Sequence, residues 1–433
     1  MHISKLTSLF GSRFFRENLI VLVVSNLTNL FMYLGQMILS RSLYKNDFSI
    51  FNSLLNLTNI VFSFYNVISF STVKTITNLP TVEERRGFSH LMLKYVSLLA
   101  ALSTLGLLIA SGEISNFLNL HSRMSIFICI SVIFILVIQA FFSGLVQGVG
   151  EYIHLSIGMF LQSLSRFLGF LAVSWLSLSY NSALWAVLYS VLVTLLYYAF
   201  SVRKLLCGAS IHVKKGTFKM MGLNAVNILF MSVLVALITN TDLIIVRHFF
   251  SGEEAGLFSV AALIGRLSYY LPGLIIYIFF AEVAKNDSAK KSSLQSLLIT
   301  GGLTTLTGAI YVVFIGLFPK FFITLLFGAN YVGSEYLTIV ISVTMAIFSL
   351  TNILFNFFTA RAVSLNLYPS YGLFVLTVGL IFAFFHNTPT QIALVLLAGI
   401  ASIFIVNVIL ACIIYRKEIR TLFINVKTTT PQQ

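Results

Sequence analysis

Apolar residues occur along this chain in long runs rather than in alternation with polar residues. The runs are roughly 20 residues long, which is the length that an α-helix needs to cross the hydrocarbon core of a bilayer, and short polar segments separate them. A transmembrane β-barrel would instead show short strands in which apolar and polar residues alternate. The pattern therefore predicts an all-α polytopic membrane protein.

We predict twelve transmembrane helices in two lobes of six. The longest internal hydrophilic segment, 203–221, separates an N-terminal lobe (18–202) from a C-terminal lobe (222–415) and is expected to be cytoplasmic. Residues 1–17 place apolar side chains on one helical face, which predicts an interfacial helix, and 416–433 form a tail. The predicted spans are approximately 18–40, 48–73, 91–111, 124–147, 154–178, 182–202, 222–246, 255–281, 294–318, 334–360, 366–386 and 389–415.

Composition strengthens this interpretation. Of 433 residues, 58% are hydrophobic and 9% are charged, whereas about a quarter of the residues in a soluble domain are charged. A soluble enzyme, a disordered regulator and a secreted disulfide scaffold are therefore excluded. The three cysteines are too few for a disulfide framework, and we expect them to be free thiols.

The net charge of +14 is best explained by membrane topology. In the twelve-span arrangement, twenty of the 27 Lys and Arg residues fall on the side of the two termini. Lys and Arg are enriched in cytoplasmic loops, so both termini are expected in the cytoplasm and no nucleic-acid partner is expected. The opposite side receives five basic residues, Arg41, Lys45, Arg123, Arg247 and Lys320.

The two halves carry a weak internal repeat. LSRSLYKNDFSIFNSL at 39–54 aligns with IVRHFFSGEEAGLFSVA at 245–261, and FFSGLVQGVGEYIHLSIGMF at 141–160 aligns with FNFFTARAVSLNLYPSYGLF at 355–374. Six is an even number of spans, so both halves begin on the same side, as in parallel repeats related by an axis along the membrane normal. Chance similarity between apolar segments is the alternative.

Four segments resemble a known family. TDLIIVRHFFSGEEAGLFSVAALIGRL at 241–267 resembles the seventh–eighth helix hairpin of the polysaccharide flippases, the Wzx-type members of the multidrug/oligosaccharidyl-lipid/polysaccharide exporter superfamily. ILSRSLYKNDFSIF at 38–51 resembles their first hairpin, and FFSGLVQGVGEY at 141–152 and FPKFFITLLFGANY at 318–331 resemble recurrent family segments. Together with the twelve-span plan, the resemblance covers nearly the whole chain.

The resemblance implies two six-helix lobes around a central cavity. It implies transport of an undecaprenyl-diphosphate-linked oligosaccharide, such as an O-antigen repeat unit, to the outer leaflet of a bacterial plasma (inner) membrane. The implied partners are this glycan lipid, the membrane lipids, and polysaccharide assembly proteins such as a polymerase and a chain-length regulator.

Two other functions stay open. A cation-coupled multidrug exporter of the same superfamily would share the plan, but the first span offers Asn26, Asn29 and Gln36 where such exporters commonly carry a coupling acid. A membrane glycan polymerase or glycosyltransferase usually needs a large outer loop or an Asp-rich site, and the outer loops here are short. Lipid II flippases of the superfamily usually carry two further spans, for which this chain has no room.

Two arginines lie inside predicted spans, Arg166 midway along the fifth and Arg266 midway along the eighth. A charge at the centre of the bilayer costs about 2.5–3.5 kcal/mol on insertion scales, so both are expected to face protein or water. We find no obvious carboxylate at the same depth, which favours a cationic cavity for a diphosphate or an acidic sugar. Arginine suits this role because its planar fork binds phosphate oxygens bidentately. A structural arginine held by carbonyls or by a neighbouring acid is the alternative.

Two polar side chains are expected to line the same cavity. Gln162 lies four residues before Arg166 and therefore shares its helical face. Asn59 is the repeat equivalent of Arg266.

The remaining candidates lie near the ends of spans, except for one acid. Arg41 and Arg247 are repeat equivalents for which interfacial anchoring is favoured over substrate contact. Arg361 ends the tenth span on the cytoplasmic side, where it would receive a head group or merely set topology. Asp242 is the one acid of the seventh span, so it is the candidate for coupling to an H+ or Na+ gradient, unless it pairs with Arg247 or with another span.

Motifs of soluble enzymes are absent from the sequence. There is no Gly-rich phosphate loop, no zinc-spaced Cys/His cluster and no nucleophile elbow. We therefore expect a transporter rather than an enzyme, with no cofactor and no bound metal.

Overall fold

A computed structural model describes residues 13–120, 122–206, 222–272, 294–361, 363–416 and 418, and every regular element in these ranges is helical. The prediction of an all-α chain is therefore confirmed for the described residues. Contacts divide the chain into two compact units, Met1–Leu229 and Phe230–Gln433. The boundary falls inside a helix rather than in the predicted loop 203–221, of which only the first residues are described.

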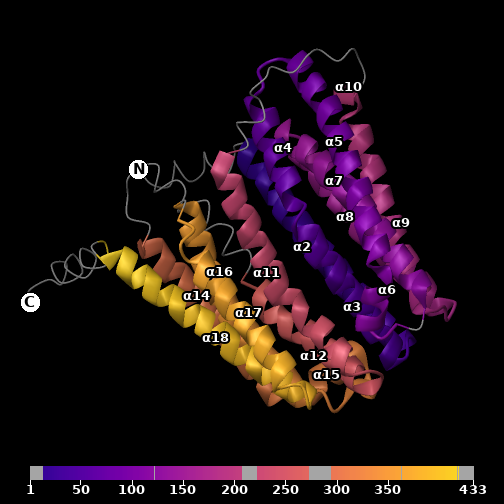
Figure 1. The fold of residues 1–433 in the computed structure, drawn as a ribbon, viewed down its shortest axis with the longest axis vertical. Helices are drawn as coiled ribbons and strands as arrows, with labels where there is room; N and C mark the ends of the chain where they lie inside the picture. The colour runs from indigo at the N-terminus through magenta and orange to yellow at the C-terminus, as the bar shows by residue number, and fades with distance from the viewer. Residues whose placement is uncertain are drawn as a thin grey trace, which may run out of the picture. The chain divides into compact units, whose positions relative to one another are not determined.

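The first unit contains α2 (Arg13–Ser42), α3 (Lys45–Ser63), α4 (Asn66–Asn78), α5 (Val82–Ile109), α6 (Ser111–Phe117), α7 (Arg123–Gly148), α8 (Tyr152–Trp175), α9 (Tyr180–Ser201) and α10 (Arg203–Leu206). At its centre is α7, which packs against α3, α4, α5, α8 and α9 (Figure 1). In the most apolar 18-residue stretch of α7, 67% of the residues are buried, whereas in that of α5 only 17% are buried. The most apolar helix of this unit is therefore its core helix, and α5 presents apolar side chains outward.

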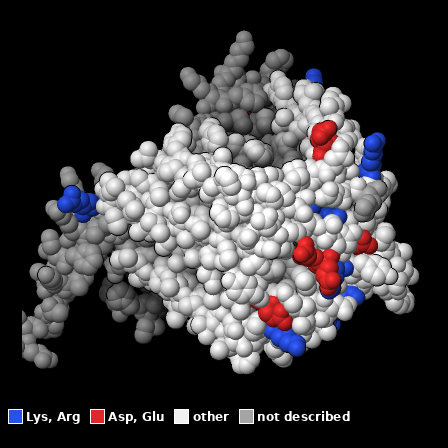
Figure 2. Space-filling model, turned by 60° about the horizontal axis from the view of Figure 1, so that its bottom comes forward, with Lys and Arg blue, Asp and Glu red and all other residues white. Residues whose placement is uncertain are grey.

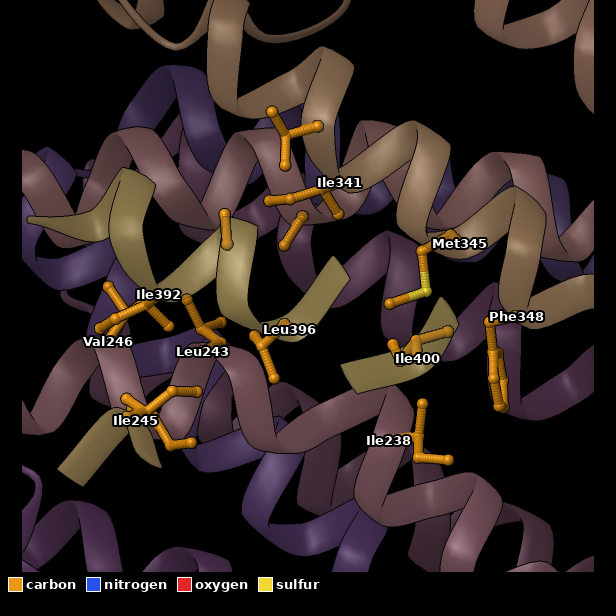
Figure 3. Packing of buried hydrophobic residues seen from close by; sticks show 14 of the residues in the cluster. Ile238, Leu243, Ile245, Val246, Ile341, Met345, Phe348, Ile392, Leu396 and Ile400 are labelled. Atoms are coloured by element: carbon orange, nitrogen blue, oxygen red, sulfur yellow. The ribbon is translucent and has the colours of Figure 1, made fainter. Parts of the chain in front are cut away.

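The second unit contains α11 (Gly222–Phe249, which begins before the boundary), α12 (Glu253–Tyr270), α14 (Leu294–Leu317), α15 (Pro319–Phe327), the short 3-10 helix η2 (Ala329–Tyr331), α16 (Glu335–Ala360), α17 (Leu367–Ala383) and α18 (Pro389–Ile414). Here α16 is the central helix and packs against α12, α14 and α18. In its most apolar 18-residue stretch, 72% of the residues are buried. Its side chains Ile341, Met345 and Phe348 meet apolar side chains of α11 and α18 in one buried cluster (Figure 3).

The order of helices repeats between the units. A long helix, a short helix and a buried central helix follow one another as α5, α6 and α7 in the first unit and as α14, α15 and α16 in the second. The central helices α7 and α16 are each 26 residues long. This repeated order agrees with the sequence repeat at the level of secondary structure.

The second predicted span, 48–73, lies within the candidate membrane span Lys45–Asn78, which consists of the two helices α3 and α4. It breaks at Phe64 and Tyr65, where the amides bond three residues back, to Val61 O at 3.3 Å and to Phe62 O at 2.8 Å. In the register of the repeat, these two residues lie opposite Leu271 and Pro272, a turn that directly follows α12. The break between α3 and α4 and the end of α12 therefore lie at the same position of the repeat.

The start of the chain also differs from the prediction. Helix α2 runs from Arg13 to Ser42 without interruption, so 13–17 belong to the same helix as the predicted first span. Residues 1–12, the rest of the predicted interfacial helix, lie outside the described residues. The short helices α6 and α15 were not predicted, because the apolar pattern merged them with neighbouring loops.

Among the described residues, nine helices are long and apolar enough to cross a membrane, and Leu367–Ala383 is a shorter apolar helix. Large apolar side chains are exposed along their outer faces, as Leu98, Leu102 and Leu105 are on α5. Most of the surface in Figure 2 belongs to uncharged residues. The protein is therefore a multi-pass membrane protein, because such a surface needs lipid as its solvent.

The backbone of helix α4 lies in close contact with the backbone of the central helix α7. A Cβ built on Gly144 of α7 would lie 2.8 Å from the carbonyl oxygen of Ser69 and 2.9 Å from Cβ of Thr72, both on α4. Backbone oxygen cannot rotate away as a side chain can, so glycine is required at this contact.

Candidate functional site

A buried ion pair joins α11 to α12 in the second unit. Nη2 of Arg266 donates to Oδ1 of Asp242 at 2.6 Å, and the side chains are 7% and 4% exposed. The pair corrects the expectation that no acid lies at the depth of Arg266. It settles the alternatives for Asp242 in favour of another helix, rather than Arg247 of its own helix.

The carboxylate of Asp242 is held asymmetrically. Its Oδ1 also accepts a hydrogen bond from the amide of Leu243 at 2.7 Å, whereas Oδ2 is buried and accepts none from the described residues. Close packing of α12 on α16 positions the arginine, since Oγ of Ser268 donates to the carbonyl of Ser342 at 2.9 Å. Removing one partner of such a pair costs about 3–5 kcal/mol because the other charge stays buried.

Arg166 lies in a different environment in the first unit. Its Nε donates to Oγ of Ser190 on α9 at 3.3 Å, and Nη1 approaches Sδ of Met32 on α2 at 3.5 Å. No carboxylate of the described chain forms an ion pair with this guanidinium. A positive charge held by a hydroxyl and a thioether keeps most of its capacity for an anion.

The amide predicted to accompany Arg166 is bonded to a neighbour that sequence reasoning missed. Nε2 of Gln139, on α7, donates to Oε1 of Gln162 on α8 at 2.9 Å. Oε1 of Gln139 is buried and has no donor among the described residues. A polar side chain at mid-span in the most apolar helix of the unit was the signal for Gln139, and it is the same signal that identified Arg166.

The repeat-equivalent arginines Arg41 and Arg247 differ in environment. Arg41 is exposed, whereas Arg247 is 0% exposed, so the side chain of Arg247 is enclosed by protein. Its neighbour Val246 belongs to the apolar cluster of the unit, which shows that this end of α11 is enclosed. Asn59, the repeat equivalent of Arg266, is exposed on α3.

Arg361 is engaged by the segment after α18 instead of being open to a head group. Its Nη1 and Nη2 donate to Oε1 and Oε2 of Glu418 at 2.8 and 3.0 Å, and its guanidinium carbon lies 4.9 Å from the ring centre of Phe357 and 4.5 Å from that of Tyr415. Burial lowers the pKa of Arg361, but hydrogen bonds and charge from Glu418 outweigh it and raise the pKa. The prediction placed Glu418 in the tail 416–433 and assigned it no partner, so it missed this contact.

The two arginines predicted inside spans thus have different environments, each within its own unit. Arg266 is neutralised by an acid on the adjacent helix, and Arg166 is held by neutral groups. Both have the planar donor fork that binds phosphate oxygens. These arrangements suit the binding of an anion.

The chain is similar to known proteins in sequence and in fold. Residues 15–283 match the model of the family described as polysaccharide biosynthesis protein. No curated protein sequence matches the chain.

Several solved structures share the fold. An inward-facing multidrug resistance MATE family transporter of the MOP superfamily is similar with a TM-score of 0.73 at 14% identity, over 93% of this chain and 96% of that one. The lipid II flippase MurJ in an inward closed conformation has a TM-score of 0.69 at 12% identity, over 96% and 94%. A MOP superfamily transporter from Pyrococcus furiosus has a TM-score of 0.58 at 15% identity, over 93% and 94%. At these identities, the likeness concerns the fold.

Proposed function

The chain belongs to the polysaccharide biosynthesis protein family, and from this we propose that it is a flippase for a lipid-linked glycan. The cargo is an undecaprenyl-diphosphate-linked oligosaccharide, such as an O-antigen repeat unit, moved from the cytoplasmic to the outer leaflet of a bacterial plasma membrane. In this proposal, twelve spans form two lobes around a central cavity that opens to each side in turn, and both termini are cytoplasmic. The polymerase and chain-length regulator of the same assembly process are the proposed protein partners.

The observation that carries the proposal is the environment of Arg166. A guanidinium within a membrane span and without a carboxylate partner is unfavourable unless water or an anionic ligand reaches it. Among the described residues, its contacts are a hydroxyl and a thioether, which leave the charge uncompensated. A diphosphate supplies both the charge and the paired oxygens that the guanidinium fork accepts.

Energy for transport is proposed to enter at Asp242. A carboxylate whose Oδ2 accepts no hydrogen bond from the described chain offers an oxygen to H+ or Na+. Any such ion competes with Arg266 for the same carboxylate, because Arg266 already neutralises it. Ion binding would therefore alter the charge that Arg266 presents to the cargo.

A cation-coupled multidrug exporter is the second candidate, and the same buried Asp242 favours it. The two candidates predict opposite phenotypes in a deletion strain. Loss of a flippase leads to accumulation of a lipid-linked oligosaccharide on the cytoplasmic side without added drug sensitivity. Loss of an exporter sensitises the cell to cationic drugs and leaves surface glycan unchanged.

The test of the flippase proposal is complementation of the deletion strain with Arg166 variants at matched membrane levels. Arg166→Lys is expected to restore surface glycan in part, because the charge survives and the bidentate geometry is lost. Arg166→Gln is expected to fail, and Arg41→Gln, at an exposed position, is the matched control and should restore glycan. Full restoration by Arg166→Gln would contradict the role assigned to Arg166, and absence of any accumulated glycan lipid in the deletion strain would contradict the flippase proposal itself.

A further inference from the structure

We propose that Asp242 is a specificity-determining residue that acts as a resident anion on Arg266 and selects diphosphate ligands over monophosphate ligands. The proposal rests on the proposed function in one respect, which is that the cargo carries a lipid-linked diphosphate. It assigns the acid a task separate from ion coupling. An incoming anion reaches Arg266 only by replacing a carboxylate that already neutralises it.

The geometry of the pair is that of an exchangeable contact. Asp242 accepts the hydrogen bond of Arg266 through Oδ1 alone, while Oδ2 receives none from the described residues. The chain offers a contrasting pair in Arg361 and Glu418, where Oε1 accepts from Nη1, Oε2 accepts from Nη2, and two aromatic rings lie near the guanidinium. The second pair is built as a permanent link, whereas the first leaves half of its carboxylate without a hydrogen bond.

Among the described residues of this unit, the charged side chain that contacts Asp242 is that of Arg266. Helices α17 and α18 contain no Asp, Glu, Lys, Arg or His, and neither does α14. The acid of α16, Glu335, lies at the start of that helix and accepts from the amide of Gly333. On α12, Glu253 and Glu254 begin the helix, more than two turns before Arg266, and on α11 itself Arg247 follows more than one turn later. Changing Asp242 therefore changes the charge balance of Arg266 directly.

A buried arginine in a bilayer is surrounded by competing ligands. Membrane phospholipids present phosphodiesters, each with one negative charge, and a guanidinium binds these oxygens as it binds those of a diphosphate. A monoanion that replaces the carboxylate exchanges one negative charge for one and gains little. A diphosphate brings at least two charges and more acceptor oxygens, so it compensates for the displaced carboxylate.

The experiment compares two probes on the full-length chain in nanodiscs of phosphatidylcholine. The probes are farnesyl diphosphate and farnesyl monophosphate, which share the lipid and differ in the head group. The wild type is expected to bind the diphosphate at least tenfold more tightly. Asp242→Asn keeps an oxygen for the amide of Leu243 and removes the charge, so it should strengthen monophosphate binding about tenfold and reduce the discrimination to a few-fold.

Two further variants define the result. Glu418→Gln removes a carboxylate from the other arginine pair and is expected to leave both affinities unchanged. The double variant Asp242→Asn/Arg266→Gln removes both charges of the pair, so neither is left without the other, and it should bind the two probes almost equally.

Each outcome separates the two levels of the argument. Equal binding of both probes by the wild type overturns the selectivity proposal without recourse to any variant. Undiminished discrimination in folded Asp242→Asn also overturns it and leaves the flippase proposal intact. No binding of farnesyl diphosphate by the wild type would instead overturn the diphosphate cargo, and with it the proposed function.

Discussion

The ion pair between Arg266 and Asp242 allows the stability of the fold to be separated from transport. Arg266→Gln alone strands a carboxylate that is 4% exposed, whereas Arg266→Gln/Asp242→Asn removes both charges and leaves two amides that can bond to each other. We expect the single variant to be much less stable than the wild type and the double variant to be nearly as stable. Neither variant is expected to transport.

The expected loss follows from the geometry. Opposite charges about 4 Å apart at an effective dielectric constant of about 20 attract by about 4 kcal/mol. Measured losses on breaking a buried pair are about 3–5 kcal/mol, while replacing both partners is often neutral. For a unit of this size, each kcal/mol shifts the melting temperature by about 2–4 °C, so the single variant should melt roughly 10 °C lower.

Thermal unfolding of the detergent-solubilised protein measures the first quantity, and complementation of surface glycan in the deletion strain measures the second. A double variant as unstable as Arg266→Gln would show that the two residues do not stabilise each other. Wild-type glycan display by the double variant would show that transport does not need the charge of Arg266.

Two further predictions concern topology and packing. Reporter fusions at Pro80 and at Gly208, the latter outside the described residues, should both be active in the cytoplasm, and a periplasmic signal at either would refute the twelve-span arrangement. Gly144→Ala should lower the melting temperature and the amount of protein in the membrane, because the added Cβ would lie 2.8 Å from the carbonyl oxygen of Ser69. Gly106→Ala should be neutral, since nothing lies within 4 Å of its added Cβ. Equal effects of the two substitutions would refute the close contact between α4 and α7.

The positions of most helices follow from the sequence because hydrophobic runs report burial or lipid contact directly. The presence of Arg266 and of Asp242 inside their spans was visible in the same way. Their pairing was not, because depth along a helix axis does not say which way a side chain points or which helix stands next to it. The rotation of α12 against α11 is set by packing with α16, where a Cβ on Gly265 would lie 2.6 Å from Cγ2 of Ile341.

Other features were invisible for local reasons. The break at Phe64 and Tyr65 contains neither proline nor glycine, so no helix-breaking residue marks it. Glu418 follows the last apolar run, where charged residues are expected for solubility. A charge at such a position does not indicate that the side chain forms an ion pair. The hydrogen bond between Gln139 and Gln162 depends on which helices are adjacent, and the hydrophobic pattern does not encode adjacency.

The end of α3 and the end of α12 lie in register in the repeat, which bears on how the chain evolved. The turn after α3 contains Phe64 and Tyr65, and the turn after α12 contains Leu271 and Pro272, so the two turns share no residue type. If the halves descend from a duplicated ancestor, the inherited trait is the position at which the helix ends rather than an amino acid. Divergence has then changed the residues while the end of the helix stayed in register. A search for ancestral features by residue identity would overlook this one, and a comparison of helix boundaries between the halves finds it.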